Sequence, residues 1–178
     1  SGVELTAGKL FGGDTFTFVT SGTQTDVGSS GNAFTYELVS ADANIDASAD
    51  YKVTKIEGAL TVTYASIKIG EVTHPATTDP TQALDYGKTG VEDVEVTYDG
   101  TGWNVQVNVG APVSGAVVHY TMTPKDLASW SSTLAFTNVG EYVVYFAVDA
   151  PNYASVTNFA KVTILPYPVT VTADDQYN

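Results

Sequence analysis

Alternation of apolar and polar residues with a period of two constrains this chain more than any other feature. Such alternation suits half-buried strands, because successive side chains of a strand point to opposite faces. Turn-forming residues separate the alternating runs, a pattern typical of an antiparallel sandwich or barrel. We therefore expect an all-β fold with a single short helical turn near residues 124–130. The runs are TFTFV (15–19), FTYELV (34–39), LTVTY (60–64), VEVTY (94–98), NVQVNV (104–109), VVHYTM (117–122), YVVYFAV (142–148), AKVTIL (160–165) and VTVTA (169–173).

A near-identical turn occurs twice, as TDVG at 25–28 and TNVG at 137–140. Each copy is followed by an apolar, tyrosine-containing strand, a loop with Asp or Asn before a Tyr, and a final strand. The duplication predicts two tandem antiparallel β-sandwich domains. We place the first repeat at 1–65, with its opening strand missing, and the second at 66–165. Residues 166–178 are then a linker and the first strand of a truncated following repeat.

The repeated segments contain four pairs of equivalent residues. The glycines suit positive φ or a close backbone approach, and the Asp and Asn side chains can bond nearby amides. We expect the valines to fill the core, and the tyrosines to bury their rings while the hydroxyls cap a loop carbonyl. The pairs are Gly28 and Gly140, Asp26 and Asn138, Val27 and Val139, and Tyr51 and Tyr153.

The net charge of the chain limits the classes of partner that it can bind. The 178 residues have a net charge of −13, and all seven cationic side chains are Lys. Nucleic acids and anionic membrane surfaces both require a basic footprint, so we expect neither as a partner. No run approaches the length of an apolar membrane span, and no signal peptide is recognisable. Export and anchoring signals would therefore lie outside this stretch.

Several segments together resemble a known family. They are SGTQTDVGSSGNAFTYEL (21–38), ADYKVTKIEGALTVT (49–63), VTYDGTGWNVQVNV (96–109), FTNVGEYVVYFAVDAPNY (136–153) and PVTVTADDQ (168–176). They resemble the tandem repeats of Gram-positive cell-surface adhesins, of the MBG and YDG types and their bacterial Ig-like relatives. The resemblance implies two immunoglobulin-like repeats of an extracellular, wall-anchored all-β protein, usually without catalysis. In such repeats a YDGT-bearing strand precedes the TDVG half, and the first unit here lacks it.

Catalysis is not expected. A nucleophile–base–orienter set must be in contact, but the chain has only two His, His74 and His119, in separate segments, and no Cys. Paired carboxylates could serve a glycosidase, yet 20 acidic residues guarantee chance pairs. We therefore expect no enzyme, and a host or cell-surface glycan or protein as the partner.

The stretch DANIDASAD (42–50) spaces oxygen-bearing side chains like part of a calcium loop. The candidate ligands are Asp42, Asn44, Asp46 and Asp50. Calcium favours such oxygen ligands, but Ala47 and Val53 stand where an EF-hand needs Gly and Glu. The alternatives are a calcium site and a solvated hairpin tip, and no other cofactor is expected.

Two tryptophans could stack on sugar faces if they are exposed. Trp103 follows a tight DGTG turn, and Trp130 lies in the polar stretch ASWSS, which makes Trp130 the better candidate for a binding surface. In a sandwich a buried Trp is the commoner outcome. Exposed Trp side chains would favour a carbohydrate-binding module of a secreted glycan-active protein, and buried ones a structural spacer.

Two further hypotheses concern covalent and non-covalent links. Lys68 and Asn158 could form an isopeptide bond if the Lys is buried beside an acid. The strand-like tail could add to an unpaired edge of the first unit in another copy, giving head-to-tail strand addition.

Overall fold

The computed structural model describes residues 2–74 and 89–174, and in these residues the fold is almost entirely β. This confirms the all-β prediction. Helical structure in the described residues consists of two three-residue 3-10 turns, η1 (Ala47–Ala49) and η2 (Leu127–Ser129). The second lies in the segment for which a helical turn was predicted. Neither turn has the length and apolar character that crossing a membrane requires.

The chain divides into two compact units, Ser1–Thr63 and Tyr64–Asn178. Sequence reasoning placed this boundary two residues later, after residue 65. Residues 166–174, expected to open a third repeat, belong to the second unit and form no strand.

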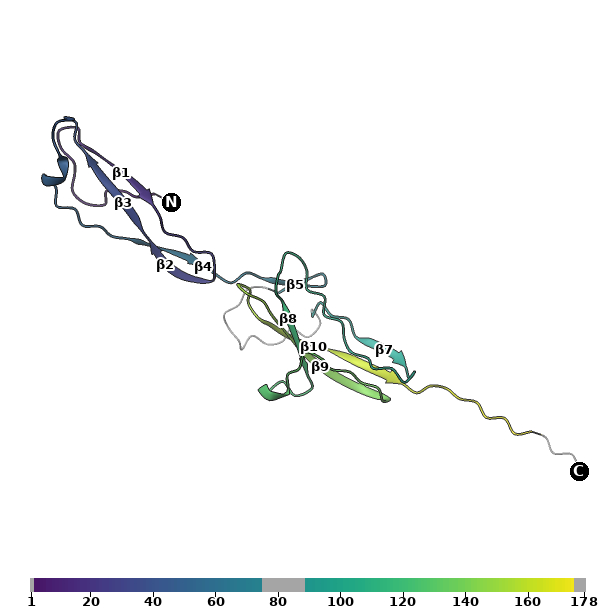
Figure 1. Cartoon of the computed structure of the whole chain (residues 1–178). Helices are drawn as coiled ribbons and strands as arrows, with labels where there is room; N and C mark the ends of the chain where they lie inside the picture. Colours follow the sequence, from purple (N-terminus) through teal and green to yellow (C-terminus); the bar gives the residue numbers. More distant parts are fainter. Residues whose placement is uncertain (1, 75–88, 175–178) are drawn as a thin grey trace, which may run out of the picture. The chain divides into compact units, whose positions relative to one another are not determined.

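The second unit is built on a four-stranded sheet with the order β7-β10-β9-β8. Figure 1 shows β10 between β7 and β9. β5 and β6 form a separate two-stranded antiparallel hairpin in the same unit. The strands are β5 (Ile67–Ile69), β6 (Val72–His74), β7 (Val94–Thr97), β8 (Val117–Thr121), β9 (Gly140–Asp149) and β10 (Val156–Leu165).

One ladder departs from the antiparallel prediction. β7 pairs with β10 in parallel, with Val94 opposite Val162 and Thr97 opposite Leu165. The other two ladders of this sheet are antiparallel. Local alternation indicates which residues form strands, but it does not determine the direction in which two strands pair. That direction depends on the path of the long connection that follows β7.

The core of the second unit lies against one face of this sheet. Val144, Phe146 and Val148 of β9 are buried at alternate positions, as are five residues of β10. Buried side chains from β5 and from outside named strands complete the cluster; they include Ile67, Ile69, Val91, Val105 and Phe136.

The prediction of a strand at 104–109 is wrong. This segment makes only isolated bridges on either side, Trp103 with Phe136 and Val109 with Ile69. Its alternation still serves packing, because Val105 is buried and Val107 packs against the core.

The first unit contains two two-stranded ladders. β1 pairs with β3, and β2 pairs with β4, both antiparallel. Among its described residues, Ala47 is the one buried apolar side chain, and several large apolar side chains are exposed. The strands are β1 (Thr15–Thr20), β2 (Gly28–Asn32), β3 (Phe34–Val39) and β4 (Gly58–Val62).

The two units nevertheless share a pairing scheme. The repeated glycine lies opposite Val62 in the first unit and opposite Ile164 in the second. Six residues after each glycine, Phe34 lies opposite Thr20, and Phe146 lies opposite Tyr120. β1, β2 with β3, and β4 therefore correspond to β8, β9 and β10. Among the described strands of the first unit, none corresponds to β7.

Candidate binding surface

Trp130 is positioned by a loop that is tied down at both ends. Asp126 caps η2 by accepting a hydrogen bond from the Ala128 N–H at 3.0 Å, as N-cap residues do. The Ser129 hydroxyl donates to the Asp126 carbonyl at 2.6 Å and also contacts the buried Thr121 hydroxyl. After the Trp, Ser131 exchanges two backbone hydrogen bonds with Tyr120 of β8, at 2.7 and 3.0 Å.

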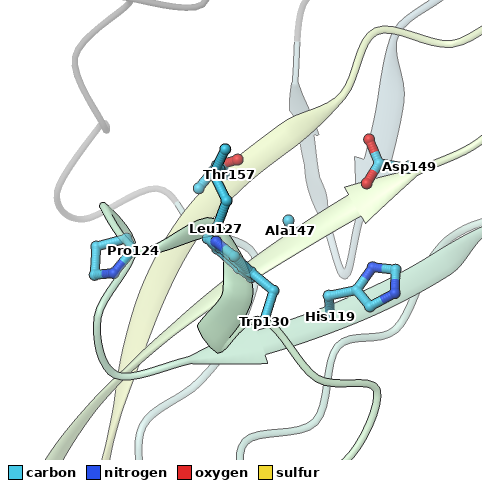
Figure 2. A pocket seen from close by; sticks show the side chains of 7 residues that line it. All are labelled: His119, Pro124, Leu127, Trp130, Ala147, Asp149 and Thr157. Carbon is cyan, nitrogen blue, oxygen red and sulfur yellow. The ribbon is translucent and has the colours of Figure 1, made fainter.

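This loop forms one wall of a hollow of about 500 Å³ on the face of the sheet opposite the core. Figure 2 shows Trp130 and Leu127 together over the sheet, with His119 and Asp149 towards one end and Pro124 towards the other. Ala147 and Thr157 belong to the floor, since they lie opposite each other on β9 and β10. His119 lies opposite Ala147 on β8.

The chemistry of the hollow is mixed. Leu127 is 87% exposed, and Trp130 is half-buried, so both apolar side chains reach solvent. His119, Asp149 and Thr157 add polar groups, and the Asp149 carboxylate also accepts a hydrogen bond from the Ser155 hydroxyl. A few polar groups around an apolar wall suit a small ligand that presents an apolar face and hydroxyl groups.

Trp103, the other predicted binding residue, has a structural environment. Its side chain packs against the core of the second unit, and its backbone exchanges two 2.9 Å hydrogen bonds with Phe136. The indole N–H donates to Asp99 Oδ1 at 3.3 Å. The structure does not bring the two tryptophans into one surface: Trp130 lines the hollow, and Trp103 does not.

Asp99 organises the YDGT turn beside Trp103. Its Oδ1 accepts hydrogen bonds from the Thr101 N–H at 2.8 Å and the Thr101 hydroxyl at 2.7 Å. These bonds to Thr101, with a smaller one from the Trp103 indole, hold the pKa of the Asp99 carboxyl below its ordinary value, because they favour the charged form.

The repeated glycines have φ of 144° at Gly28 and 159° at Gly140. In both turns the residue two before the glycine accepts a side-chain hydrogen bond at its carbonyl. Gln24 Nε2 donates to Asp26 at 2.6 Å, and the Tyr142 hydroxyl donates to Asn138 at 3.0 Å.

The donor side chains also lie against the glycines. A β-carbon at Gly28 would be 3.3 Å from Gln24 Nε2, and one at Gly140 would be 3.1 Å from the Tyr142 hydroxyl. The same turn therefore disfavours a side chain for two reasons, its backbone conformation and the group lying across it.

Two predictions about this turn are corrected. Val139 does not fill the core, because it is 48% exposed, whereas Val27 is half-buried. The tyrosine that caps a carbonyl is Tyr142, whose ring stacks on Phe136 with the centroids 4.2 Å apart. Tyr153 instead packs against the core and makes a backbone bridge with Ala65.

Tyr51 is tied to the start of the first unit. Its hydroxyl accepts from the Phe11 N–H at 2.9 Å and donates to Asp14 Oδ2 at 2.8 Å, so it caps an amide rather than the predicted carbonyl. The Phe11 bond favours the phenolate, but partial desolvation and the Asp14 and Asp50 carboxylates outweigh it and raise the pKa of Tyr51. The Ala41 N–H and the Tyr51 hydroxyl lower the pKa of Asp14.

The segment from Asp42 to Asp50 forms local turns rather than a cation cage. Asp42 Oδ1 accepts from the Asn44 backbone and side-chain amides, both at 3.0 Å. Asp46 Oδ1 accepts from the Ser48 N–H at 2.9 Å and caps η1. The Asp50 N–H closes that turn on Ala47 at 3.2 Å.

These bonds lower the pKa of the Asp42 carboxyl, through Asn44, and that of the Asp46 carboxyl, through Ser48. In residues 2–74 and 89–174, no three His, Asp or Glu side chains gather in a group able to hold a metal ion. The hydrogen bonds within the segment are those of a solvated turn, and the calcium alternative stays a prediction.

The two histidines lie in different surroundings. His74 Nε2 is 3.2 Å from the Thr89 carbonyl oxygen, and His119 lines the hollow. The isopeptide hypothesis fails on its first requirement, a buried lysine. Lys68 is partly exposed and pairs with Glu71 at 3.0 Å, whereas Asn158 is buried and bonds the Phe159 N–H at 2.9 Å.

Sequence reasoning missed most of the hollow. Leu127, His119 and Asp149 join Trp130 only because the register of β8, β9 and β10 and the η2 loop bring them together. The one local signal was Leu127, a large apolar residue directly after the charged pair Lys125 and Asp126.

Comparison with protein-family models, with curated proteins and with solved structures gave no significant match.

Proposed function

We propose that this chain is a non-catalytic structural and adhesive repeat segment of a bacterial wall-anchored surface protein. The observation that carries the proposal is the shared pairing scheme. Both units place the repeated glycine at the start of the same antiparallel ladder, opposite Val62 in one and Ile164 in the other. Tandem units that repeat a register are characteristic of modular, extended proteins.

The finer fold assignment is part of this proposal. The second unit has a four-stranded sheet on one side of its core and β5 with bridged segments on the other. This two-layer packing supports an immunoglobulin-like sandwich for the second unit and a related, incomplete one for the first. The acidic surface suits a role in solvent, since a net charge of −13 opposes non-specific association.

The location is tested by labelling intact cells of the source organism with an antibody raised against this chain. Labelling without permeabilisation, which is lost after brief treatment with external protease, is the expected result. Signal that appears only after permeabilisation would overturn the proposed extracellular, wall-anchored location. An antibody against a cytoplasmic protein provides the control for cell integrity.

A second candidate function is a carbohydrate-binding module of a secreted glycan-active protein. The hollow at Trp130 favours it, because an exposed leucine and an indole line a surface that also carries His119 and Asp149. Aromatic and aliphatic walls with a few polar groups are what small-ligand sites use.

A glycan array with the wild-type chain and Trp130→Ala separates the two functions. Binding to one glycan class that Trp130→Ala abolishes would favour the module. Tyr98→Ala is the matched control, because Tyr98 is an exposed aromatic outside the hollow. If no glycan binds, or if Trp130→Ala binds as the wild type does, the carbohydrate-binding module is excluded at this hollow and the structural spacer remains.

A further inference from the structure

Within the described residues, one edge of β4 has no strand beside it. Among the described strands, β4 pairs with β2 alone, whereas the corresponding β10 has β9 on one side and β7 on the other. β4 also presents Leu60 and Val62, half-buried, at positions that correspond to the fully buried Val162 and Ile164. An unpaired edge beside partly exposed apolar side chains is a template for another strand.

Residues 169–174 resemble β7 and its turn in sequence. Residues 94–99 of β7 and its turn are VEVTYD, and residues 169–174 are VTVTAD, so both Val, the Thr and the Asp are identical. In β7, Val94 and Val96 pack against the core. In the tail, the corresponding Val169 and Val171 are 81% and 92% exposed, and the yellow trace after β10 carries no strand arrow (Figure 1).

We propose that residues 169–172 of one molecule add as a parallel strand to β4 of a second copy of this chain. The register follows from the second unit. Val96 lies opposite Ile164, and the repeated glycines equate Ile164 with Val62. Val171 therefore lies opposite Val62, Val169 opposite Leu60, and Thr170 opposite Thr61.

Addition in this register provides both backbone hydrogen bonds for β4 and burial for the two valines. Backbone groups on the open edge of β4 gain partners, and the two tail valines turn towards Leu60 and Val62, while Thr170 points to the opposite face. In β7 the turn residue Tyr98 donates its N–H to the Leu165 carbonyl at 2.8 Å. The corresponding bond joins the Ala173 N–H to the Thr63 carbonyl.

One departure makes the added ladder weaker than the ladder within the second unit. Asp93 precedes β7 and accepts the Lys161 N–H at 2.8 Å, but Pro168 stands at the corresponding place in the tail. Association is therefore reversible and concentration-dependent. It is also head-to-tail, so it does not close on itself. Because the copies are strongly acidic, added salt strengthens it.

Sedimentation equilibrium on the whole chain tests the proposal. The average mass of the wild type is expected to rise with concentration. Val171→Asp places a charge against Val62 and should weaken association by at least about tenfold. Thr170→Asp is the matched control, since it adds the same charge one residue away on the solvent face and should retain association. A wild type that is monomeric throughout, or equal loss in both variants, overturns the proposal.

The absence of Cys from the chain allows a direct test of register. Paired residues on neighbouring strands lie within disulfide reach, so Thr61→Cys and Thr170→Cys molecules, when mixed and oxidised, should form a mixed dimer. Thr17→Cys on β1 replaces Thr61→Cys as the control and should not. A Thr61→Cys, Thr170→Cys double variant that closes within single chains overturns the second copy as the partner. None of these results depends on where the protein is located in the cell.

Discussion

Gly140 and Tyr142 are coupled, because the tyrosine hydroxyl lies where a β-carbon at residue 140 would press against it. The hydroxyl reaches the Asn138 carbonyl from that position, and the ring continues onto Phe136. In the first unit Gln24 performs the same capping from the other side of its turn. The repeated motif therefore specifies a capped turn, while the capping residue itself differs between the units.

Gly140→Ala should destabilise the second unit by about 1–3 kcal/mol, and by more than Gly100→Ala, because it combines an unfavourable φ with displacement of Tyr142. Gly100→Ala is the control, since its φ is 80° but nothing lies within 4 Å of its added β-carbon; it should cost about 1–2 kcal/mol. Urea unfolding followed by Trp fluorescence reports on this unit, which contains both tryptophans. An effect of Gly140→Ala no larger than that of Gly100→Ala would contradict the proposed contact.

Tyr142→Phe should cost about 0.5–1.5 kcal/mol of unfolding free energy, the usual net value of one hydrogen bond. Tyr98→Phe removes a hydroxyl from an exposed ring and should be close to neutral. If the two variants unfold at the same urea concentration, the bond to Asn138 contributes nothing measurable.

Asp99 gives the second unit a defined pH dependence. Its folded pKa lies below the ordinary value of 3.8 that applies to the unfolded chain. The stabilisation is therefore fully present above that value, and is lost as the pH falls through the folded pKa. Asp99→Asn should be less stable than wild type at neutral pH, and the difference should shrink as the pH falls below the ordinary value of 3.8. A difference in urea midpoint that does not change with pH would exclude this role for the carboxylate.

At the scale of elements, local alternation predicted most strands because each lies half-buried on a sheet. β3 matches its predicted range, and β1, β4, β7, β8, β9 and β10 match within a few residues. β2, with the sequence GSSGN, was missed because it contains no apolar residue; only pairing with β4 makes it a strand. The three-residue β5 and β6 are too short for a period to be recognised.

The candidate site was less predictable than the strands, because it depends on pairing between distant segments. A polar stretch around Trp130 indicated a surface aromatic, and the structure places it at a hollow. The residues beside it come from three strands whose mutual register is set by long-range pairing, which no local pattern encodes. The sequence favoured Trp130 over Trp103 as the binding residue, but it could not reveal the structural environment of Trp103, because the contact of its indole with Asp99 and the pairing of its backbone with Phe136 are tertiary features.

The Asp42–Asp50 segment should be indifferent to calcium. Its carboxylates already accept hydrogen bonds from backbone amides of the same turn, and specific binding to the folded state would raise the melting temperature by mass action. We expect the melting temperature in millimolar calcium to equal that in EDTA. Magnesium at the same concentration controls for ionic strength, and a rise with calcium alone would restore the metal-site interpretation.

At the scale of the whole molecule, the two units differ in what can hold them together. The second buries a continuous apolar cluster across β5, β9 and β10. In the described part of the first, Ala47 is the one buried apolar residue, while Phe11, Phe18 and Ile56 are exposed. Since burial of apolar surface is the main force that offsets chain entropy, the first unit as it stands has little to offset it.

Hydrogen exchange on the intact chain should reveal this difference directly. Amides of β9 and β10 are expected to exchange slowest, because they open only when the core of the second unit unfolds. Amides of β1 and β3 should exchange many times faster under the same conditions, although their ladder is as regular.

The proposed strand addition to β4 can be tested in the same exchange experiment, by varying the protein concentration. Protection of β2 and β4 should rise with protein concentration in the wild type and in Thr170→Asp, but not in Val171→Asp, while β9 stays constant as the internal reference. Equal protection in both units at low concentration would mean that the first unit is stabilised by something other than its own packing.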